Sequence, residues 1–214
     1  MSRRRRFATP SGPVSGLLDD ADGPLLIVAH GAGADMISPV LAGFAEGLKA
    51  GGVACLRFNF NYREQGRKAP DHERVLRAAW TSVFEKMASD GRSVWVGGKS
   101  LGGRIASMVV ADGMPAAGLV FLGYPLHPPG KPERIRDAHL PSIRVPMLFI
   151  QGTGDPFARR DLLDGVLRKL GERAVLHPVE GGDHSFRVRG RPRDDEATGR
   201  RLGSVAARFV RRRG

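Results

Sequence analysis

The chain has 214 residues, of which 41% are apolar, and this suffices for one domain with a sizeable core. No apolar run approaches the ~20 residues that span a bilayer, which argues against a helical membrane protein. The single cysteine, Cys55, excludes an intrachain disulfide. The polar stretch after the first arginines is unlike an export signal, so we expect a cytoplasmic protein.

The formal net charge of +12 is concentrated near the two ends of the chain. Residues 3–6 carry +4 and residues 187–213 carry +7, so the remaining body carries only +1. Basic termini can bind nucleic acid or other polyanions. Few aromatic side chains lie among these arginines, and we therefore expect solvated tails. On this basis residues 1–6 are a basic arm and residues 7–214 are a single domain.

Residues 7–20 are expected to hold one or two edge strands. After residue 20, short apolar runs alternate with segments of helical periodicity. In chain order the pattern predicts a strand at 25–29, helix at 36–48, strand at 53–60, helix at 71–89, strand at 93–97, helix at 100–111, strands at 118–124 and 146–151, helix at 158–170, strand at 173–179 and helix at 197–211. This alternation indicates an α/β fold with a mostly parallel sheet and helices on both faces. Ligands in such folds bind beyond the carboxyl ends of the strands.

The segment GKSLG at 98–102 directly follows the third apolar run and opens a helical segment. It fits the Gly-x-Ser-x-Gly pattern, in which Gly98 and Gly102 let a tight strand-to-helix turn close around Ser100. This context predicts a nucleophile elbow. The alternative is a glycine-rich turn with a capping serine. A phosphate loop does not fit, because Ser93 stands where its first glycine is required.

A serine hydroxyl needs a neighbouring base to act as a nucleophile. Among the six histidines, His184 lies in the glycine-rich segment EGGDHSF, between the last expected strand and the last helix. The carboxyl edge of the sheet is expected there, so His184 is the candidate base. The alternative is a surface-loop histidine.

Asp155 closes the apolar run PMLFIQ and lies between Ser100 and His184 in the chain, as the acid of this fold does. It is therefore the candidate to orient the imidazole, and the alternative is a turn aspartate before Pro156. Asp161 and Asp164 are weaker candidates because they lie inside the following helix, and Asp183 is weaker because it is directly beside His184 in the sequence. No set of histidines and acids has the spacing of a metal site, so no metal is expected.

The first expected parallel strand runs into HGAGA at 30–34. Small residues there let the backbone approach a substrate, so its N–H groups can face a developing negative charge. We expect an oxyanion hole formed by the backbone amides of Ala32 and Leu101, the latter following the nucleophile. A plain glycine-rich turn is the alternative.

The segments HGAGA, GGKSLGGR, QGTGDP and GGDHSF stand in the order typical of the α/β-hydrolase superfamily, over roughly residues 20–212. The chain resembles the small, lidless hydrolases grouped with vertebrate testis-expressed and NSL-complex-subunit proteins, and more distantly the dienelactone hydrolases. The resemblance implies an α/β-hydrolase fold without a lid domain and places Ser100, Asp155 and His184 at the positions of a catalytic triad. Some members of this branch are better known as complex subunits than as enzymes.

These observations predict a serine hydrolase that acts on a small ester, thioester or related acyl substrate and needs no cofactor. The alternative is a binding or scaffold protein that keeps the fold and uses its basic termini. The Pro-rich connection between the strands at 118–124 and 146–151 has room for at most a short helix at 133–138. We therefore expect a shallow, open site.

Overall fold

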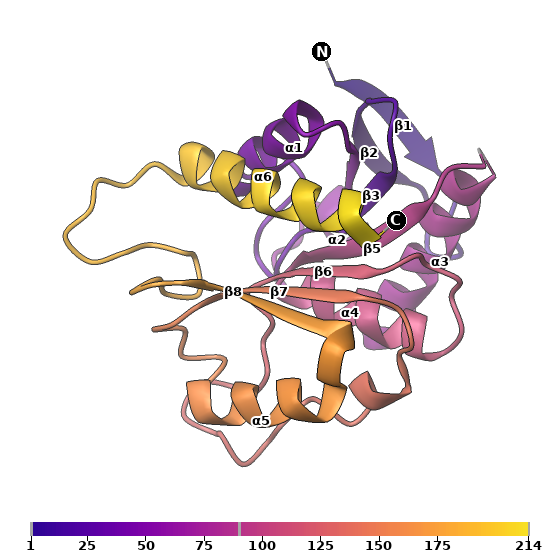
Figure 1. Cartoon of the computed structure of the whole chain (residues 1–214). Helices are drawn as coiled ribbons and strands as arrows, with labels where there is room; N and C mark the ends of the chain where they lie inside the picture. Colours follow the sequence, from indigo (N-terminus) through magenta and orange to yellow (C-terminus); the bar gives the residue numbers. More distant parts are fainter. Residues whose placement is uncertain (1, 90, 214) are drawn as a thin grey trace.

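Eight strands form one sheet, in the spatial order β1-β2-β4-β3-β5-β6-β7-β8, in the computed structural model, which describes residues 2–89 and 91–213 (Figure 1). Strands β3 to β8 run parallel, and β1 and β2 form an antiparallel extension at one edge. The strands are β1 Arg3–Phe7, β2 Val14–Asp19, β3 Leu25–Ala29, β4 Ala54–Phe58, β5 Val94–Lys99, β6 Leu119–Leu122, β7 Met147–Gly152 and β8 Ala174–Val179. The helices are α1 Pro39–Ala50, α2 Asn61–Glu64, α3 Glu73–Ala88, α4 Leu101–Ala111, α5 Arg160–Leu170 and α6 Asp195–Arg213.

The helices cover the two faces of the sheet, as the buried apolar strands require. Helices α1 and α6 pack on one face, and α3, α4 and α5 pack on the other (Figure 1). The central strands β3, β4 and β6 are buried along their whole length. The predicted parallel sheet with helices on both faces is confirmed, and each strand and helix predicted from residue 25 onward is present with boundaries shifted by a few residues.

Two parts of the chain differ from the sequence-based expectation. Residues 3–6 do not form a free arm, because they belong to β1, which pairs with β2 from Arg3 opposite Leu18 to Phe7 opposite Val14. Backbone hydrogen bonds hold such an edge strand even where its side chains are polar, and only Phe7 of β1 is buried. The short helix α2 follows β4 and was not anticipated, since one helical turn is too short to show a period.

Small residues allow α1 and α6 to pack at close range. Gly43 and Gly47 of α1 face the backbone of α6, and a Cβ atom on either would overlap a carbonyl oxygen of Glu196 or Arg200. Gly203 of α6 faces the backbone of α1 in the same way. The contact therefore depends on the absence of side chains at these positions.

The connection from β6 to β7 carries no lid. In residues 123–146, all described by the structure, the helical residues are the 3₁₀ turn Leu140–Ser142, and residues 133–138, which had room for at most a short helix, form none. The proline at 132 and the glycine at 130 favour turns over a helix there. The fold therefore leaves the edge of the sheet above β5 and β6 without an added domain.

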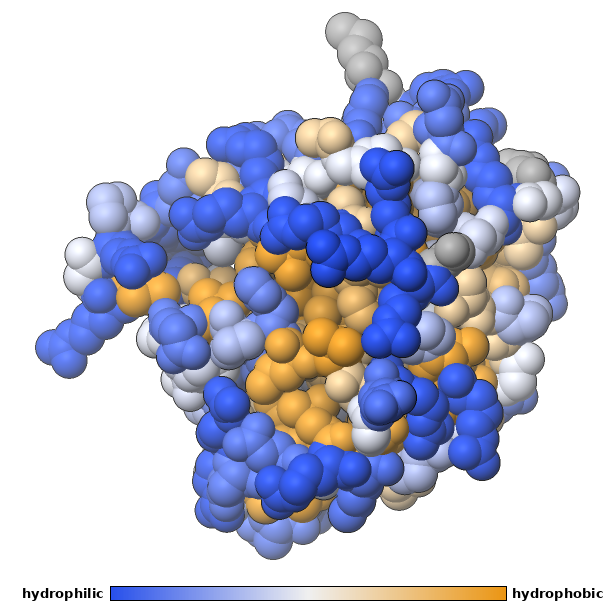
Figure 2. All heavy atoms as spheres, viewed as in Figure 1, coloured by the Kyte–Doolittle hydropathy of each residue, from blue (hydrophilic) through white to orange (hydrophobic). Residues whose placement is uncertain are grey.

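The edge strand β8 is only half-buried. Figure 2 shows the side of the molecule on which β8 lies, with apolar side chains in its middle, between the polar surfaces of α6 and α5. Here a groove of about 840 Å³ runs between β8 and α6, and its apolar lining includes Val179, Leu202 and Val205. No helix among the described residues is both long and apolar enough to cross a membrane.

Candidate active site

The candidate residues come from four loops at one edge of the sheet. From β3 the chain passes to β4 on one side, and from β4 it crosses back over β3 to β5 on the other side. The strand order therefore reverses between β3 and β5. A crevice forms at such a point beyond the carboxyl ends of the strands. Ser100 follows β5, and the segment 30–34 follows β3. Asp155 and His184 follow β7 and β8 at the same edge.

Ser100 occupies a tight turn between β5 and α4. Its backbone φ is 50°, in the left-handed region that non-glycine residues rarely adopt. The turn lies so close to β3 that a Cβ atom at Gly98 or Gly102 would overlap the carbonyl oxygen of Ala29. Glycine is therefore required at both positions where the sequence predicted an elbow, and the turn holds the hydroxyl of Ser100 out from the strand.

A continuous chain of hydrogen bonds joins the three predicted residues. Oγ of Ser100 lies 2.9 Å from Nε2 of His184. Nδ1 of His184 lies 2.7 Å from Oδ2 of Asp155. Since a carboxylate only accepts, Nδ1 carries the imidazole proton and Nε2 is free to accept a proton from the serine hydroxyl. The arrangement can deprotonate Ser100 and hold the resulting imidazolium beside a carboxylate.

The Asp155 side chain is fully buried, and two further groups fix it. The Gln151 side-chain amide donates to Oδ2 at 2.5 Å, and the backbone N–H of Phe157 donates to Oδ1 at 2.8 Å. The Phe157 ring lies against the His184 ring, with centroids 4.3 Å apart. Gln151 opens the segment QGTGDP, but the segment by itself predicts no role for it, and Phe157 belongs to none of the quoted segments. The acid and base are thus held by packing as well as by hydrogen bonds.

The predicted oxyanion donors are the backbone N–H groups of Leu101, which directly follows Ser100, and of Ala32, in the segment after β3. Within residues 2–89 and 91–213, neither the Ala32 nor the Leu101 N–H donates to any acceptor. Leu101 opens α4, where the helix dipole favours negative charge. A Cβ atom at Gly31 would lie 3.5 Å from Cβ of Ser100, so the segment after β3 passes directly beside the serine.

The buried His30 anchors the segment that carries Ala32. The backbone N–H of Phe60 donates to Nε2 of His30 at 3.2 Å, so Nδ1 is protonated and donates to the Gly31 carbonyl at 2.8 Å. Burial lowers the pKa of His30 to about 4, which keeps the ring neutral near pH 7. A neutral ring with this tautomer ties the segment to the end of β4.

Lys99, the residue before Ser100, carries a buried ammonium group that sequence reasoning missed. Within the described residues, its Nζ atom has no hydrogen-bond partner, and it lies 5.4 Å from the centre of the Phe186 ring. Burial lowers the pKa of Lys99 to about 8, although the charges of Asp155 and Asp183 act in the opposite direction. The sequence around Lys99 gives no sign that this side chain is buried, because lysine side chains are normally exposed.

The strand order and the Ser–His–Asp arrangement define an α/β-hydrolase. A family model described as an alpha/beta hydrolase domain matches residues 22–211, and the chain belongs to this family.

Solved structures of similar fold include a serine hydrolase without a lid. A serine hydrolase without a lid from Xanthomonas campestris is 20% identical, with a TM-score of 0.76 over 99% of this chain and 94% of that one. A dienelactone hydrolase from Anabaena variabilis is 18% identical, with a TM-score of 0.77 over 100% and 98%. The esterase domain of a Rhodothermus marinus protein is 15% identical, with a TM-score of 0.75 over 99% and 98%. At these identities the likeness is one of fold.

Proposed function

We propose that the protein is a serine hydrolase that cleaves a small ester, thioester or related acyl substrate through an acyl-serine intermediate. The observation that carries this proposal is the hydrogen-bonded series from Ser100 through His184 to Asp155, at 2.9 Å and 2.7 Å. Membership of the α/β-hydrolase family and the esterase structures of similar fold support it. The cytoplasmic location expected from the sequence is part of this proposal.

The proposed reaction begins when Ser100 attacks the substrate carbonyl. His184 takes the hydroxyl proton on Nε2 as the Oγ–carbon bond forms, and Asp155 stabilises the imidazolium. The carbonyl π electrons move to the oxygen, which becomes an oxyanion. The N–H groups of Ala32 and Leu101 donate to this oxygen, and one such donor typically contributes a factor of about 10²–10³ in rate.

The tetrahedral intermediate then collapses to an acyl-serine. The bond from carbon to the leaving group breaks, and His184 Nε2 donates its proton to the departing oxygen or sulfur. A water molecule next loses a proton to His184 and attacks the acyl carbon. The second tetrahedral intermediate releases the carboxylic acid and returns the proton to Oγ of Ser100, so the enzyme is regenerated without a cofactor.

A fluorophosphonate probe tests the proposal, because it reacts covalently only with an activated serine. We expect stoichiometric labelling of the intact protein, with the label on the peptide that contains Ser100. Ser100→Ala should abolish labelling, whereas Ser204→Ala, a half-buried control on α6, should leave it unchanged. A folded protein that is not labelled would favour the scaffold alternative.

A further inference from the structure

Arg136 has no acidic partner in the part of the chain that the structure describes. Within the described residues, no carboxylate lies within 4.0 Å of its guanidinium, although this residue is half-buried. Burial lowers the pKa of Arg136, and the charges of Arg104 and Arg134 lower it further. Two other positive charges therefore act on a partly desolvated guanidinium, and an anion bound there would offset their repulsion.

Arg104, which acts on Arg136, is itself poorly neutralised. Its side chain is mostly buried, and its Nε atom has no hydrogen-bond partner in the described part of the chain. Its one acid is Glu73 at 3.4 Å, and Glu73 also pairs with Arg77 at the shorter distance of 3.0 Å. One carboxylate thus faces two arginines, and Arg104 retains unused donors.

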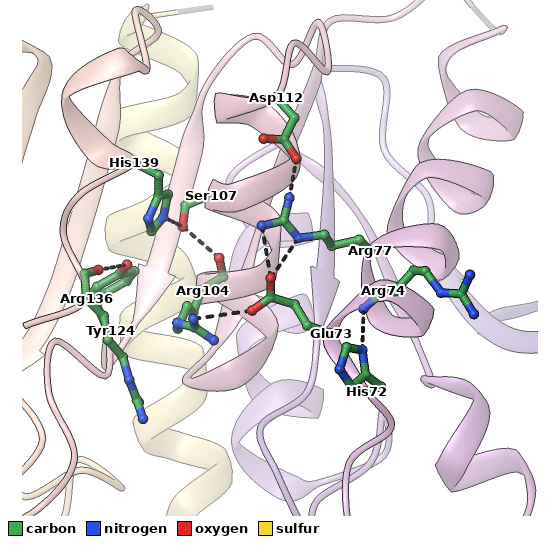
Figure 3. Close-up of polar contacts among 10 residues, drawn as sticks. All are labelled: His72, Glu73, Arg74, Arg77, Arg104, Ser107, Asp112, Tyr124, Arg136 and His139. Atoms are coloured by element: carbon green, nitrogen blue, oxygen red, sulfur yellow. Dashed lines mark hydrogen bonds and ion pairs between the residues drawn. The ribbon is translucent and has the colours of Figure 1, made fainter. Parts of the chain in front are cut away.

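Both arginines lie at the end of α4 that carries Ser100. Figure 3 shows the guanidinium groups of Arg104 and Arg136 at the end of α4 that lies away from Asp112. The backbone N–H of Arg104 donates to the carbonyl of Ser100 at 3.0 Å, so the two residues are one helical turn apart, about 6 Å along the axis. Side chains in a helix lean toward its N-terminus, so the side chain of Arg104 leaves its backbone on the Ser100 side, and its guanidinium reaches Glu73 at the start of α3.

The backbone of Arg136 is fixed from both sides. Its N–H donates to the carbonyl of Leu126 at 2.8 Å, and its carbonyl accepts from the buried Tyr124 hydroxyl at 2.8 Å. Tyr124 begins this connection two residues after Leu122, whose carbonyl accepts from the backbone N–H of Ser100 at 3.0 Å. The segment that presents Arg136 therefore starts directly beside the proposed nucleophile.

We propose that Arg104 and Arg136 form an anion-binding subsite that selects substrates whose acyl chain ends in a carboxylate. This inference rests on the proposed serine-hydrolase function and names its substrate class, the monoesters of dicarboxylic acids. A carboxylate accepts paired hydrogen bonds from a guanidinium. Its charge also relieves the repulsion between the two arginines. The subsite holds the far end of the acyl chain while the ester carbonyl lies at Ser100.

The test compares two esters of equal chain length, mono-p-nitrophenyl adipate and p-nitrophenyl hexanoate, with the uncatalysed rate subtracted. We expect the wild-type kcat/KM to be about tenfold or more higher for the anionic ester. Arg104→Gln and Arg136→Gln should each lower this ratio about tenfold, chiefly through KM. Arg136→Glu should reverse the preference toward the cationic p-nitrophenyl 6-aminohexanoate. Arg144→Gln, an exposed control in the same connection, should leave the ratio within twofold.

A second measurement needs no variant. The wild-type preference for the anionic ester should fall as the salt concentration rises from 0.05 to 0.5 M, because salt screens the attraction. Equal kcat/KM for the two esters, or a ratio unchanged in both glutamine variants, overturns the subsite while leaving the hydrolase function intact. Failure to hydrolyse any ester, together with no fluorophosphonate label on Ser100, overturns the proposed function and the subsite with it.

Discussion

Nε2 of His184 lies 2.9 Å from Oγ of Ser100, although 84 residues of chain separate them and β6 and β7 lie between their strands. Three strand spacings amount to about 14 Å, so the segment after β8 must reach back across the sheet. It does so over the end of β7, where the Gly154 N–H donates to the carbonyl of Gly182 at 2.9 Å. A Cβ atom at Gly152 would overlap this carbonyl oxygen. Close backbone packing therefore brings the base to the serine.

Replacing Ser100 separates activity from stability. We expect both Ser100→Ala and Ser100→Gly to lower kcat for a p-nitrophenyl ester by at least about 10⁴-fold, because the nucleophile is lost. Glycine also relieves the strain of the left-handed backbone at φ 50°. Ser100→Gly should therefore have a free energy of unfolding about 1 kcal/mol above that of Ser100→Ala, as measured by urea denaturation. Equal stability of the two variants would show that this backbone is unstrained.

Asp155→Asn should impair catalysis far more than the matched change at two nearby aspartates. Asparagine at 155 can donate to Nδ1 and so favours the wrong tautomer of His184, which we expect to lower kcat by about 10³–10⁴-fold. Asp183 accepts two backbone N–H groups, from Ser185 and Arg187, and an asparagine oxygen can accept the same bonds. Asp161 forms an exposed pair with Arg159. Asp183→Asn and Asp161→Asn should change kcat less than tenfold, and similar losses at all three positions would contradict the assignment.

The absence of a lid predicts a preference for short neutral acyl chains. Without a covering domain, a long chain stays in water and forfeits about 0.8 kcal/mol for each CH₂ group left unburied. Among neutral p-nitrophenyl esters from two to twelve acyl carbons, kcat/KM should be highest for the short members. There should be no increase in rate above the micelle concentration of the substrate. A maximum at long chains would show that another surface, such as the groove beside β8, buries the acyl group.

Two helical glycines should respond in opposite ways to replacement by alanine, because one lies in the α1–α6 contact and the other, in α5, has open space around it. Gly47→Ala would force the helices apart, because its Cβ overlaps the carbonyl oxygen of Arg200, and we expect a loss of about 2 kcal/mol in the free energy of unfolding. At Gly165 in α5 the nearest atom to an added Cβ is the flexible Arg168 guanidinium at 3.8 Å. Gly165→Ala should therefore stabilise the protein by about 0.5–1 kcal/mol. Urea unfolding of the two variants measures both effects, and a neutral Gly47→Ala would show that the helices can separate freely.

The buried Lys99 predicts a pH-dependent gain from its removal. Its pKa is lowered from 10.5 to about 8, so the unfolded chain binds the proton more tightly than the folded one. Below about pH 8 both states are protonated, and the folded state carries the full cost of the buried charge. Lys99→Met should then stabilise the protein by on the order of 2 kcal/mol at pH 7.

As the pH rises from 8 to 10.5, the folded wild type loses this proton first, so the advantage of Lys99→Met should decline over that range. Unfolding midpoints of the wild type and of Lys99→Met, measured at pH 7, 8, 9 and 10, show how their difference in stability changes with pH. A gain that stays constant over this range would show that Lys99 is charged in the folded state throughout.

The sequence by itself determined the parallel sheet and the order of the site residues. Continuous apolar runs indicate strands buried on both faces, and the strand-turn-helix setting of Ser100 defines the elbow locally. The edge at which parallel strands end then brings residues from separate loops together. The strand formed by Arg3–Phe7 could not be predicted in this way, since it is held by backbone pairing with β2 and its side chains show no apolar alternation.

Only the tertiary structure decided which groups surround the site. The sequence gives no sign of the burial of Lys99, of the support of Asp155 by Gln151 or of the electrostatic effect of Arg104 on Arg136. Periodicity records whether a side chain faces the core, but not which distant side chain it meets there. That depends on strand order, loop path and backbone distance, which are properties of the whole packed chain.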